Sequence, residues 1–212
     1  MAPRPQRIDP RSVPKKGQGR SGRPGGRTSG PAKARPATLG DWIGAARIPT
    51  LPLSIAPVVL GTGVAHLTAS VEDGPGWHWL RALACLAVAV CLQIGVNFAN
   101  DYSDGVRGTD AVRSGPRRLT ASGAAKPRTV LTVAIVFFAL AAIAGAIITV
   151  RTEQWWFLGV GAAAILAAWF YTGGKRPYGY AGLGEVAVFL FFGLVATVGT
   201  TYALIGQVPQ DA

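Results

Sequence analysis

The sequence predicts an all-α fold, a polytopic membrane helical bundle with about five spanning helices. Half of the 212 residues are hydrophobic and only 15% are charged, a balance that does not suit an ordinary soluble domain. The apolar residues gather in segments that approach the ~20 residues required of a membrane helix. Glycine and alanine recur throughout these segments, as expected where helix backbones approach closely in lipid.

Before the first apolar segment lies a basic tail, residues 1–40. It carries ten Lys or Arg side chains against one acid, Asp9, a net of +9 out of the chain's formal charge of +11. Because the tail nearly lacks large apolar side chains, it cannot offset its ordering entropy, and we expect it to be disordered. It has no aromatic residue for base stacking, so no nucleic-acid partner is expected. Attraction to anionic lipid and an inert, solvated extension are both open.

The expected membrane domain covers residues 41–212. Its first span contains three prolines, so the start of that span is expected to be kinked or irregular. The spans are placed at residues 48–70, 80–100, 129–150, 154–172 and 183–205.

The connections between the spans alternate between basic and nearly neutral. The tail, the 101–128 loop and the 173–182 loop are rich in Lys and Arg, whereas the other two connections are short and balanced in charge. The positive-inside rule therefore predicts a multi-pass cell-membrane protein whose N-terminus and two basic loops face the cytoplasm. Tryptophans, whose rings favour the membrane interface, lie at the opposite boundary: Trp77, Trp79, Trp155 and Trp156.

Acidic and amide side chains lie at the end of the second apolar segment. Asn97, Asp101 and Asp104 stand at positions i, i+4 and i+7, so they share one face if the helix continues to Asp104. Asn100 lies beside that face, and two glycines then release the chain into a loop that can bring Asp110 back towards it. Hard oxygen ligands of this kind suit Mg²⁺ and leave positions for water and phosphate. The pattern therefore predicts a magnesium site that holds a phosphorylated substrate.

Helix capping and plain solvation are the alternatives for these polar residues. Either accounts for one or two of them, but not for a whole face that begins inside an apolar span, where polar groups are costly. The basic residues that follow have two explanations as well. Arg107 and Arg118 can neutralise a diphosphate that the metal compensates only in part, yet the positive-inside rule alone also places Lys and Arg here.

A second candidate element follows the fourth span, on the same predicted side as the Asp-rich loop. Tyr171 and Lys175 are four residues apart and can aim a phenol and an ammonium group at one anion. An aromatic interface belt with a basic topology signal explains the pair equally well. Glu185, just inside the fifth span, is a further acid that we expect to join a cation or an arginine.

The Asp-rich segment also carries a resemblance. It reads Asn97-x-x-Asn100-Asp101-Tyr102-x-Asp104-Gly-x-x-Gly-x-Asp110. This resembles the first Asp-rich motif of the UbiA-type intramembrane prenyltransferases, in detail that of the 1,4-dihydroxy-2-naphthoate polyprenyltransferases of menaquinone biosynthesis. Further stretches agree in the family's order: Ala46-Arg47-x-Pro49-Thr50-Leu51-Pro52, Gly115-Pro116-x-Arg118, Tyr171-Thr172-Gly173-Gly174, and Pro177-Tyr178-Gly179-Tyr180-x-Gly182-Leu183-Gly184-Glu185. Each stretch alone is weak, but together they cover residues 41–205.

The resemblance implies a helical bundle with a central cavity that opens to lipid. A polyprenyl diphosphate would bind there to Mg²⁺, ionise to an allylic cation and be attacked by the ring of 1,4-dihydroxy-2-naphthoate. The implied products are demethylmenaquinone, diphosphate and CO2. The implied metal ligands are Asn97, Asp101, Asp104 and Asp110. The implied catalytic residues are Asp101, Asp104, Tyr171 and Lys175, and the implied substrate-binding residues are Asn97, Asn100, Arg107, Arg118 and Lys175.

The chain departs from the family pattern in two places. Asp110 breaks the regular Asp spacing of the wider superfamily but suits the naphthoate branch. Family members have about nine membrane helices and a second Asp-rich loop, whereas this sequence ends after about five spans. The second metal-binding half is therefore expected to be missing, and the 212-residue chain alone is expected to be inactive.

Other classes of protein compete with a prenyltransferase. A CDP-alcohol phosphotransferase also holds a diphosphate with Asp residues on membrane helices, but its later Asp pair is absent from this sequence. A fragment of an ion-coupled transporter would explain acids in the membrane, but not their concentration on one side rather than at the midplane. A structural scaffold leaves the Asp face unexplained. Within the prenyltransferases, another aromatic acceptor is the alternative substrate.

Overall fold

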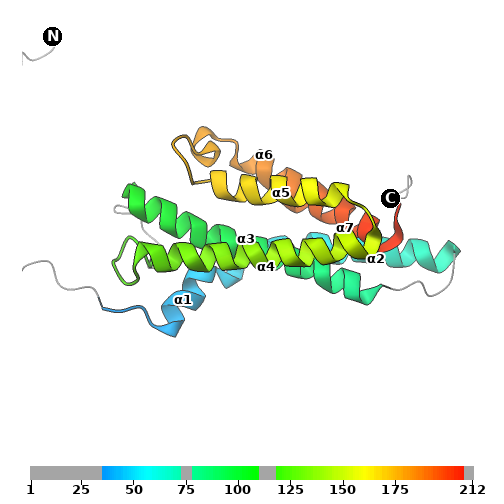
Figure 1. Cartoon of the computed structure of the whole chain (residues 1–212), viewed down its shortest axis with the longest axis horizontal. Coiled ribbons are helices and arrows are strands. Elements are labelled where there is room, and N and C mark those ends of the chain that lie inside the picture. Colours follow the sequence, from blue (N-terminus) through cyan, green and yellow to red (C-terminus); the bar gives the residue numbers. More distant parts are fainter. Residues whose placement is uncertain (1–34, 73–77, 110–117, 208–212) are drawn as a thin grey trace, which may run out of the picture. The chain divides into compact units, whose positions relative to one another are not determined.

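The computed structural model describes residues 35–72, 78–109 and 118–207, and every regular element within them is a helix (Figure 1). Four helical segments in these ranges are long and apolar enough to cross a membrane. They are α2 (Pro52–Glu72), α3 (Trp79–Arg107), α4 (Pro127–Thr152) and the segment Gly184–Ile205. The last segment consists of α6 (Gly184–Val188), a π-helix η5 (Phe189–Val195) and α7 (Ala196–Ile205). The predicted polytopic helical bundle is confirmed.

The span predicted at 154–172 is shorter than expected. Its helix, α5, covers Trp156–Phe170, which is 15 residues and falls short of the ~20 that a perpendicular crossing requires. The helix stops because the next residues form a turn, in which the N–H of Gly173 donates to the carbonyl of Trp169 and Gly174 takes a φ of 76°.

A short helix precedes the first span, where the sequence predicted the end of the tail and an irregular start. This helix, α1, covers Leu39–Ala46 and begins with a capping box formed by Thr38 and Asp41. Hydrogen bonds from the backbone N–H and the hydroxyl of Thr38, with the nearby guanidinium of Arg35, lower the pKa of Asp41 to about 2. The carboxylate therefore stays ionised and caps the helix at neutral pH. Residues 1–34, most of the predicted tail, lie outside the described residues.

Between α1 and α2 the chain turns sharply. Arg47 ends α1 in the left-handed conformation, with a φ of 54°, which is uncommon for a residue with a side chain. A single 3-10 turn, Ile48–Thr50, follows, and α2 begins at Pro52. Proline suits the first position of a helix because its missing N–H would have no helical partner there. The predicted irregular start is confirmed, and it delays the span by four residues relative to position 48.

Two pairs of helices make the most extensive contacts in the described part of the bundle. α3 packs along α4, and a Cβ atom on Gly95 of α3 would lie 2.7 Å from the ring of Phe138 of α4. α2 packs against α7, where the hydroxyl of Thr201 donates to the carbonyl of Gly61 over 3.0 Å. Glycine at these positions lets the helix backbones approach each other.

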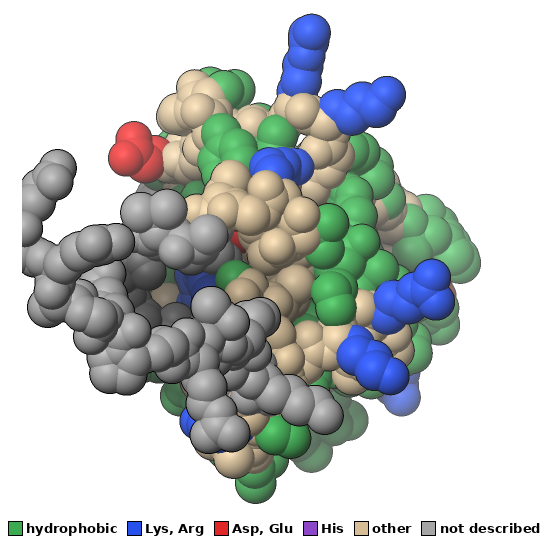
Figure 2. All heavy atoms as spheres, turned by 90° about the vertical axis from the view of Figure 1, so that its left-hand side faces the viewer, with side chains coloured by type: hydrophobic (Ala, Val, Ile, Leu, Met, Phe, Trp, Pro, Cys, Tyr) green, Lys and Arg blue, Asp and Glu red, His purple; other side chains and the backbone are tan. Residues whose placement is uncertain are grey.

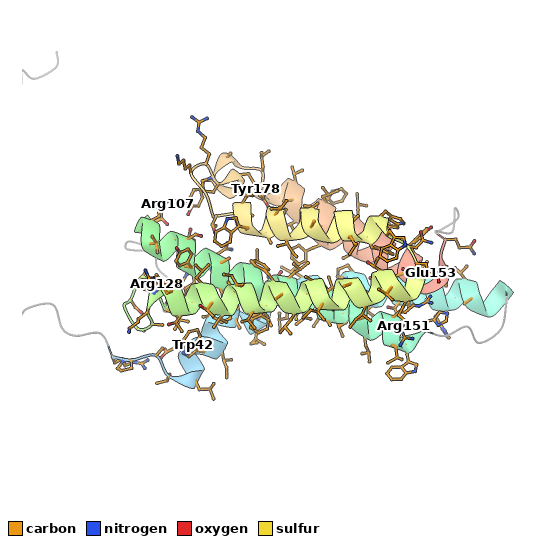
Figure 3. All side chains as sticks on the ribbon, in the orientation of Figure 1. Trp42, Arg107, Arg128, Arg151, Glu153 and Tyr178 are labelled. Carbon is orange, nitrogen blue, oxygen red and sulfur yellow. The ribbon has the colours of Figure 1, made fainter. Side chains whose placement is uncertain are left out.

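One end of the bundle carries several of the described loops (Figure 1). The loop with the 3-10 helix η4 (Tyr178–Ala181) lies at the same end as α1, and so do residues 118–126, which precede α4. In Figure 3, Arg107, Arg128 and Tyr178 lie at this end, and Arg151 lies at the other. Figure 2 looks onto this end and shows Lys and Arg side chains projecting from it.

Candidate functional site

A cavity of about 650 Å³ lies between α2, α3, α5 and the α6–α7 segment. Most of its wall is apolar and is contributed by Ala, Val, Leu and Phe side chains of these helices. Polar side chains also line it, and most of them lie where the helices approach the end of the bundle that carries α1. The residues there form the polar end of the cavity: Arg47, Thr50, Gln93, Asn97, Asn100, Tyr171 and Tyr178. Thr200 and Tyr202 of α7 also line the cavity.

The polar residues come mainly from α3, which continues without a break to Arg107 and ends at Gly108. The predicted helical face is therefore confirmed. Asn97, Asn100, Asp101 and Asp104 are all buried on it. Burial of so many polar groups requires partners, and the structure gives each of them one.

Asn97 faces the turn between α1 and α2. Its side-chain amide donates to the carbonyl of Ala46 over 2.9 Å and lies 3.4 Å from the hydroxyl of Thr50. Gln93, one helical turn earlier, donates to the same hydroxyl over 3.1 Å. These bonds fix the backbone next to Arg47, so the strained conformation at Arg47 is held by α3.

Asp101 faces the connection between α3 and α4. Its two carboxylate oxygens accept the backbone N–H groups of Leu119 and Thr120, both over 2.9 Å, and the residue is 0% exposed. One turn later the backbone of Gly105 lies so close to Thr120 that a Cβ atom would be 2.5 Å from its side chain. Asp101 therefore anchors this connection to α3 and fixes the chain next to Arg118, which is half-buried.

Asp104 faces the loop between α5 and α6. The hydroxyl of Tyr180 donates to its Oδ1 atom, and Asp104 is 5% exposed. Arg107, which was predicted to bind a diphosphate, instead donates to the carbonyls of Thr172 and Gly174 over 2.8 and 2.7 Å. Its role towards a substrate stays a prediction.

Tyr171 and Lys175, the two residues of the second predicted element, lie in different environments. Tyr171 lines the cavity, and its ring is 5.6 Å from that of Tyr178 in an edge-to-face arrangement. Lys175 is exposed and does not line the cavity. The difference arises because α5 ends at Phe170, so the four-residue spacing is not a helical turn. Glu185 is exposed and pairs with no basic residue in the described ranges.

Donor chemistry at the polar end fits a hard cation. Asn97 and Asn100 line the cavity, and Asp104 lies one helical turn after Asn100, outside the lining. Their carboxylate and amide oxygens are the ligand type that Mg²⁺ prefers, and water completes such sites. Residues 35–72, 78–109 and 118–207 contain no group of three or more His, Cys, Asp or Glu side chains that could hold a metal alone. Asp110, the remaining predicted ligand, lies outside the described residues. Each Asp101 oxygen accepts one N–H and has a second lone pair, so its metal role stays a prediction.

Sequence reasoning missed several residues that the structure brings to this site. Arg47, Thr50, Tyr178 and Tyr180 all lie in stretches that carry the family resemblance, which was the available signal. Gln93 could have been found from helical spacing, because it stands four residues before Asn97 and extends the polar face towards the membrane interior.

The cavity of this membrane bundle is mostly apolar and also carries amide, phenol and guanidinium groups. Such a lining defines a class of protein that binds an amphiphile with an apolar tail and a charged head. The chain belongs to the UbiA prenyltransferase family, whose model matches residues 54–212.

Several relatives agree with the family. The chain is 54% identical over 167 residues to a 1,4-dihydroxy-2-naphthoate octaprenyltransferase of Mycobacterium tuberculosis, an alignment that covers 78% of this chain and 54% of the relative. It is 36% identical to the protein of the same name from Escherichia coli, covering 76% and 52% of the two chains. A 2-carboxy-1,4-naphthoquinone phytyltransferase of Synechocystis is 28% identical, covering 79% and 52%.

The chain spans about half the length of the curated relatives that it matches. No solved structure matches it.

Proposed function

We propose that the protein transfers a polyprenyl group from a polyprenyl diphosphate to 1,4-dihydroxy-2-naphthoate in a Mg²⁺-dependent reaction. The observation that carries this proposal is the cavity, in which a long apolar wall meets the buried polar face of α3. The names of the relatives supply the acceptor and the class of donor.

The head group of the donor is proposed to bind at the polar end. Asp104, Asn97 and Asn100 would hold the cation, and Asp101 and Asp110 are further proposed ligands. When bound, Mg²⁺ neutralises part of the charge on the leaving diphosphate. Arg118 and Lys175 are proposed to supply positive charge, since Arg and Lys suit phosphate oxygens.

The isoprenoid tail is proposed to occupy the apolar part of the cavity. This wall keeps water away from an allylic cation, which would otherwise be quenched to an alcohol. The rings of Tyr171 and Tyr178 line the same cavity, and aromatic faces attract cations. Burial and the neighbouring Tyr171 raise the pKa of Tyr178, so its hydroxyl stays protonated and donates to the carbonyl of Ala167.

The bond changes of the proposed reaction balance without another reactant. The allylic C–O bond of the donor breaks, and its electron pair leaves with diphosphate. The electron-rich naphthoate ring forms the new C–C bond, and loss of the carboxylate as CO2 returns its electron pair to the ring. The product is demethylmenaquinone in its quinol form. Arg47, which lines the polar end, carries the charge that a carboxylate acceptor requires.

The test uses the natively expressed protein in its membrane, supplied with octaprenyl diphosphate and 1,4-dihydroxy-2-naphthoate. We expect prenylated naphthoquinol that disappears with EDTA, returns with Mg²⁺ and falls at least a hundredfold in Asp104→Asn. Asp41→Asn is the matched control, because Asp41 caps α1 and does not belong to the polar face of α3. Turnover that is indifferent to Mg²⁺ and to Asp104→Asn would contradict the proposal.

A further inference from the structure

The loop between α5 and α6 is bound to the polar face of α3 by side chains from both. The hydroxyl of Thr172 donates to Oδ1 of Asn100 over 2.6 Å, inside the buried region. From the end of α3, Arg107 donates to two successive loop carbonyls, those of Thr172 and Gly174. The rigid fork of a guanidinium suits two acceptors at once. These contacts fix the start of the loop on the helix.

Arg107 also holds the far part of the same loop. Its guanidinium carbon lies 5.4 Å from the centroid of the Tyr180 ring, within range of a cation–π interaction. Arg107 does not line the cavity. Its described contacts are therefore made to the loop, and they place Tyr180 beside the last turns of α3.

Tyr180 in turn contacts Asp104. Its hydroxyl donates to Oδ1 of the carboxylate, and the hydroxyl of Thr109 lies 3.4 Å from the Tyr180 oxygen and 3.2 Å from the Asp104 carbonyl. Tyr180 is 53% exposed, whereas Asp104 is 5% exposed. A half-exposed ring thus reaches inwards to a buried acid and gives its carboxylate a hydrogen-bond donor, without which a buried polar group is costly.

We propose that Tyr180 is a positioning residue, which fixes the carboxylate of Asp104 in the orientation that receives the cation and its diphosphate. Arg107 holds Tyr180 in place. This inference rests on the proposed function and deepens it, because it assigns the 171–183 loop to assembly of the head-group site.

The opposite effect, competition between the hydroxyl and the cation, is the alternative. A carboxylate has about four lone-pair positions on its two oxygens. The Tyr180 hydroxyl uses Oδ1, and no donor in the described ranges reaches Oδ2. One oxygen can therefore be oriented while the other binds. If Tyr180 positions the carboxylate, removal of its hydroxyl should weaken cation binding. If the hydroxyl competes with the cation, its removal should tighten binding. The direction of the change in affinity therefore distinguishes the two effects.

The test is Tyr180→Phe in the purified, natively expressed protein, with Mn²⁺ as a paramagnetic probe and inorganic diphosphate present. Free Mn²⁺ measured by electron paramagnetic resonance gives the dissociation constant without turnover. We expect that constant to rise about tenfold, because removal of a group that orients a metal ligand typically lowers metal affinity about 10- to 100-fold. The Mg²⁺ concentration for half-maximal prenyl transfer should rise by the same factor.

Tyr102→Phe is the matched control. It removes a phenol hydroxyl from α3, the helix that carries Asp104, but Tyr102 packs against the cluster around Phe98 and does not line the cavity. Its dissociation constant for Mn²⁺ should equal that of the wild type. An unchanged or lower constant in Tyr180→Phe would overturn the inference and leave the proposed function standing. Failure of the wild type to bind Mn²⁺ or to turn over would instead overturn both.

Arg107→Met provides a second route to the same answer. The variant keeps an aliphatic side chain but removes the guanidinium group, so Tyr180 loses its contact with Arg107 while Asp104 itself is unchanged. We expect a similar rise in the Mn²⁺ dissociation constant. Because Arg107 acts through Tyr180, the double variant should bind Mn²⁺ no more weakly than Tyr180→Phe alone. Additive losses in the double variant would contradict the inferred coupling.

Discussion

The Asp101 carboxylate holds the connection between α3 and α4 in place, whether or not it also binds the proposed cation. It is fully buried, and both of its oxygens accept backbone N–H groups of the α3–α4 connection. Hydrogen bonds to a charged acceptor are stronger than neutral ones. The connection also buries Leu119 completely, so the anchor and the core support each other.

Asp101→Asn should therefore destabilise the protein in the absence of metal. An amide replaces one acceptor oxygen with a donor, which leaves a buried N–H unpaired at a cost of about 2–3 kcal/mol. The measurement is thermal unfolding of the purified protein in EDTA. Asp104→Asn is the control, because an amide oxygen can still accept from Tyr180, and it should lose less stability. Equal unfolding temperatures for Asp101→Asn and the wild type would refute the anchoring role.

Sequence reasoning predicted the polar face of α3 but not the partners of its residues. Helical periodicity is local, so the spacing of Asn97, Asp101 and Asp104 was enough to place them together. Their partners come from loops far away in the chain, such as Leu119 for Asp101 and Tyr180 for Asp104. Propensity and pattern contain no information about such contacts.

At the scale of elements, the close approach of α2 and α7 depends on one glycine, Gly61. A Cβ atom on Gly61 would lie 2.4 Å from the carbonyl oxygen of Thr197, a distance that backbone atoms cannot accommodate. Gly63, two residues later on the same helix, has no atom within 4 Å of the equivalent position. The two glycines thus form a matched pair.

Gly61→Ala should destabilise the protein, and Gly63→Ala should not. The methyl group of Gly61→Ala would push α2 away from α7, and we expect this to lower the free energy of unfolding by about 1–3 kcal/mol, as in other overpacked interfaces. Gly63→Ala relieves only the helix-propensity penalty of glycine and should be neutral or slightly stabilising. Chemical or thermal unfolding in detergent measures both. Equal stability of the two variants would show that α2 and α7 can move apart without destabilising the protein.

The existence of the elements was easier to predict than their ends. Runs of apolar residues identify membrane helices because lipid leaves no other way to satisfy the backbone. The shortened α5 and the π-helix Phe189–Val195 were not predicted. Short π-helical segments within α-helices are frequently found at functional sites. Phe191, Phe192, Leu194 and Val195 of this turn line the cavity, and no local pattern in the sequence marks it.

For the whole molecule, the polar chemistry is concentrated at one end of the bundle. α1, the polar end of α3 and the loop with Tyr178 all lie there, whereas Arg151 lies at the opposite end (Figure 3). The predicted alternation of basic and neutral connections therefore agrees with the folded arrangement. Which end faces the cytoplasm is a proposal that rests on the positive-inside rule.

The helix α4 provides a direct test of that proposal. It has 26 residues and is long enough to cross the hydrocarbon core, because each helical residue rises ~1.5 Å. Arg128 and Arg151 lie at its two ends, and both are exposed (Figure 3). Cysteines introduced there, one at a time and with Cys85 and Cys91 replaced by alanine, can be labelled with a membrane-impermeant maleimide.

We expect Arg151→Cys to react on intact cells and Arg128→Cys to react only in inverted vesicles. Lys126 remains beside position 128 in both variants, so the basic bias that sets the orientation is kept. The reverse labelling pattern would place the polar end of the cavity outside the cell. The head group of a donor and the acceptor would then have to be supplied from that side, and the proposed reaction would need a different source of both substrates.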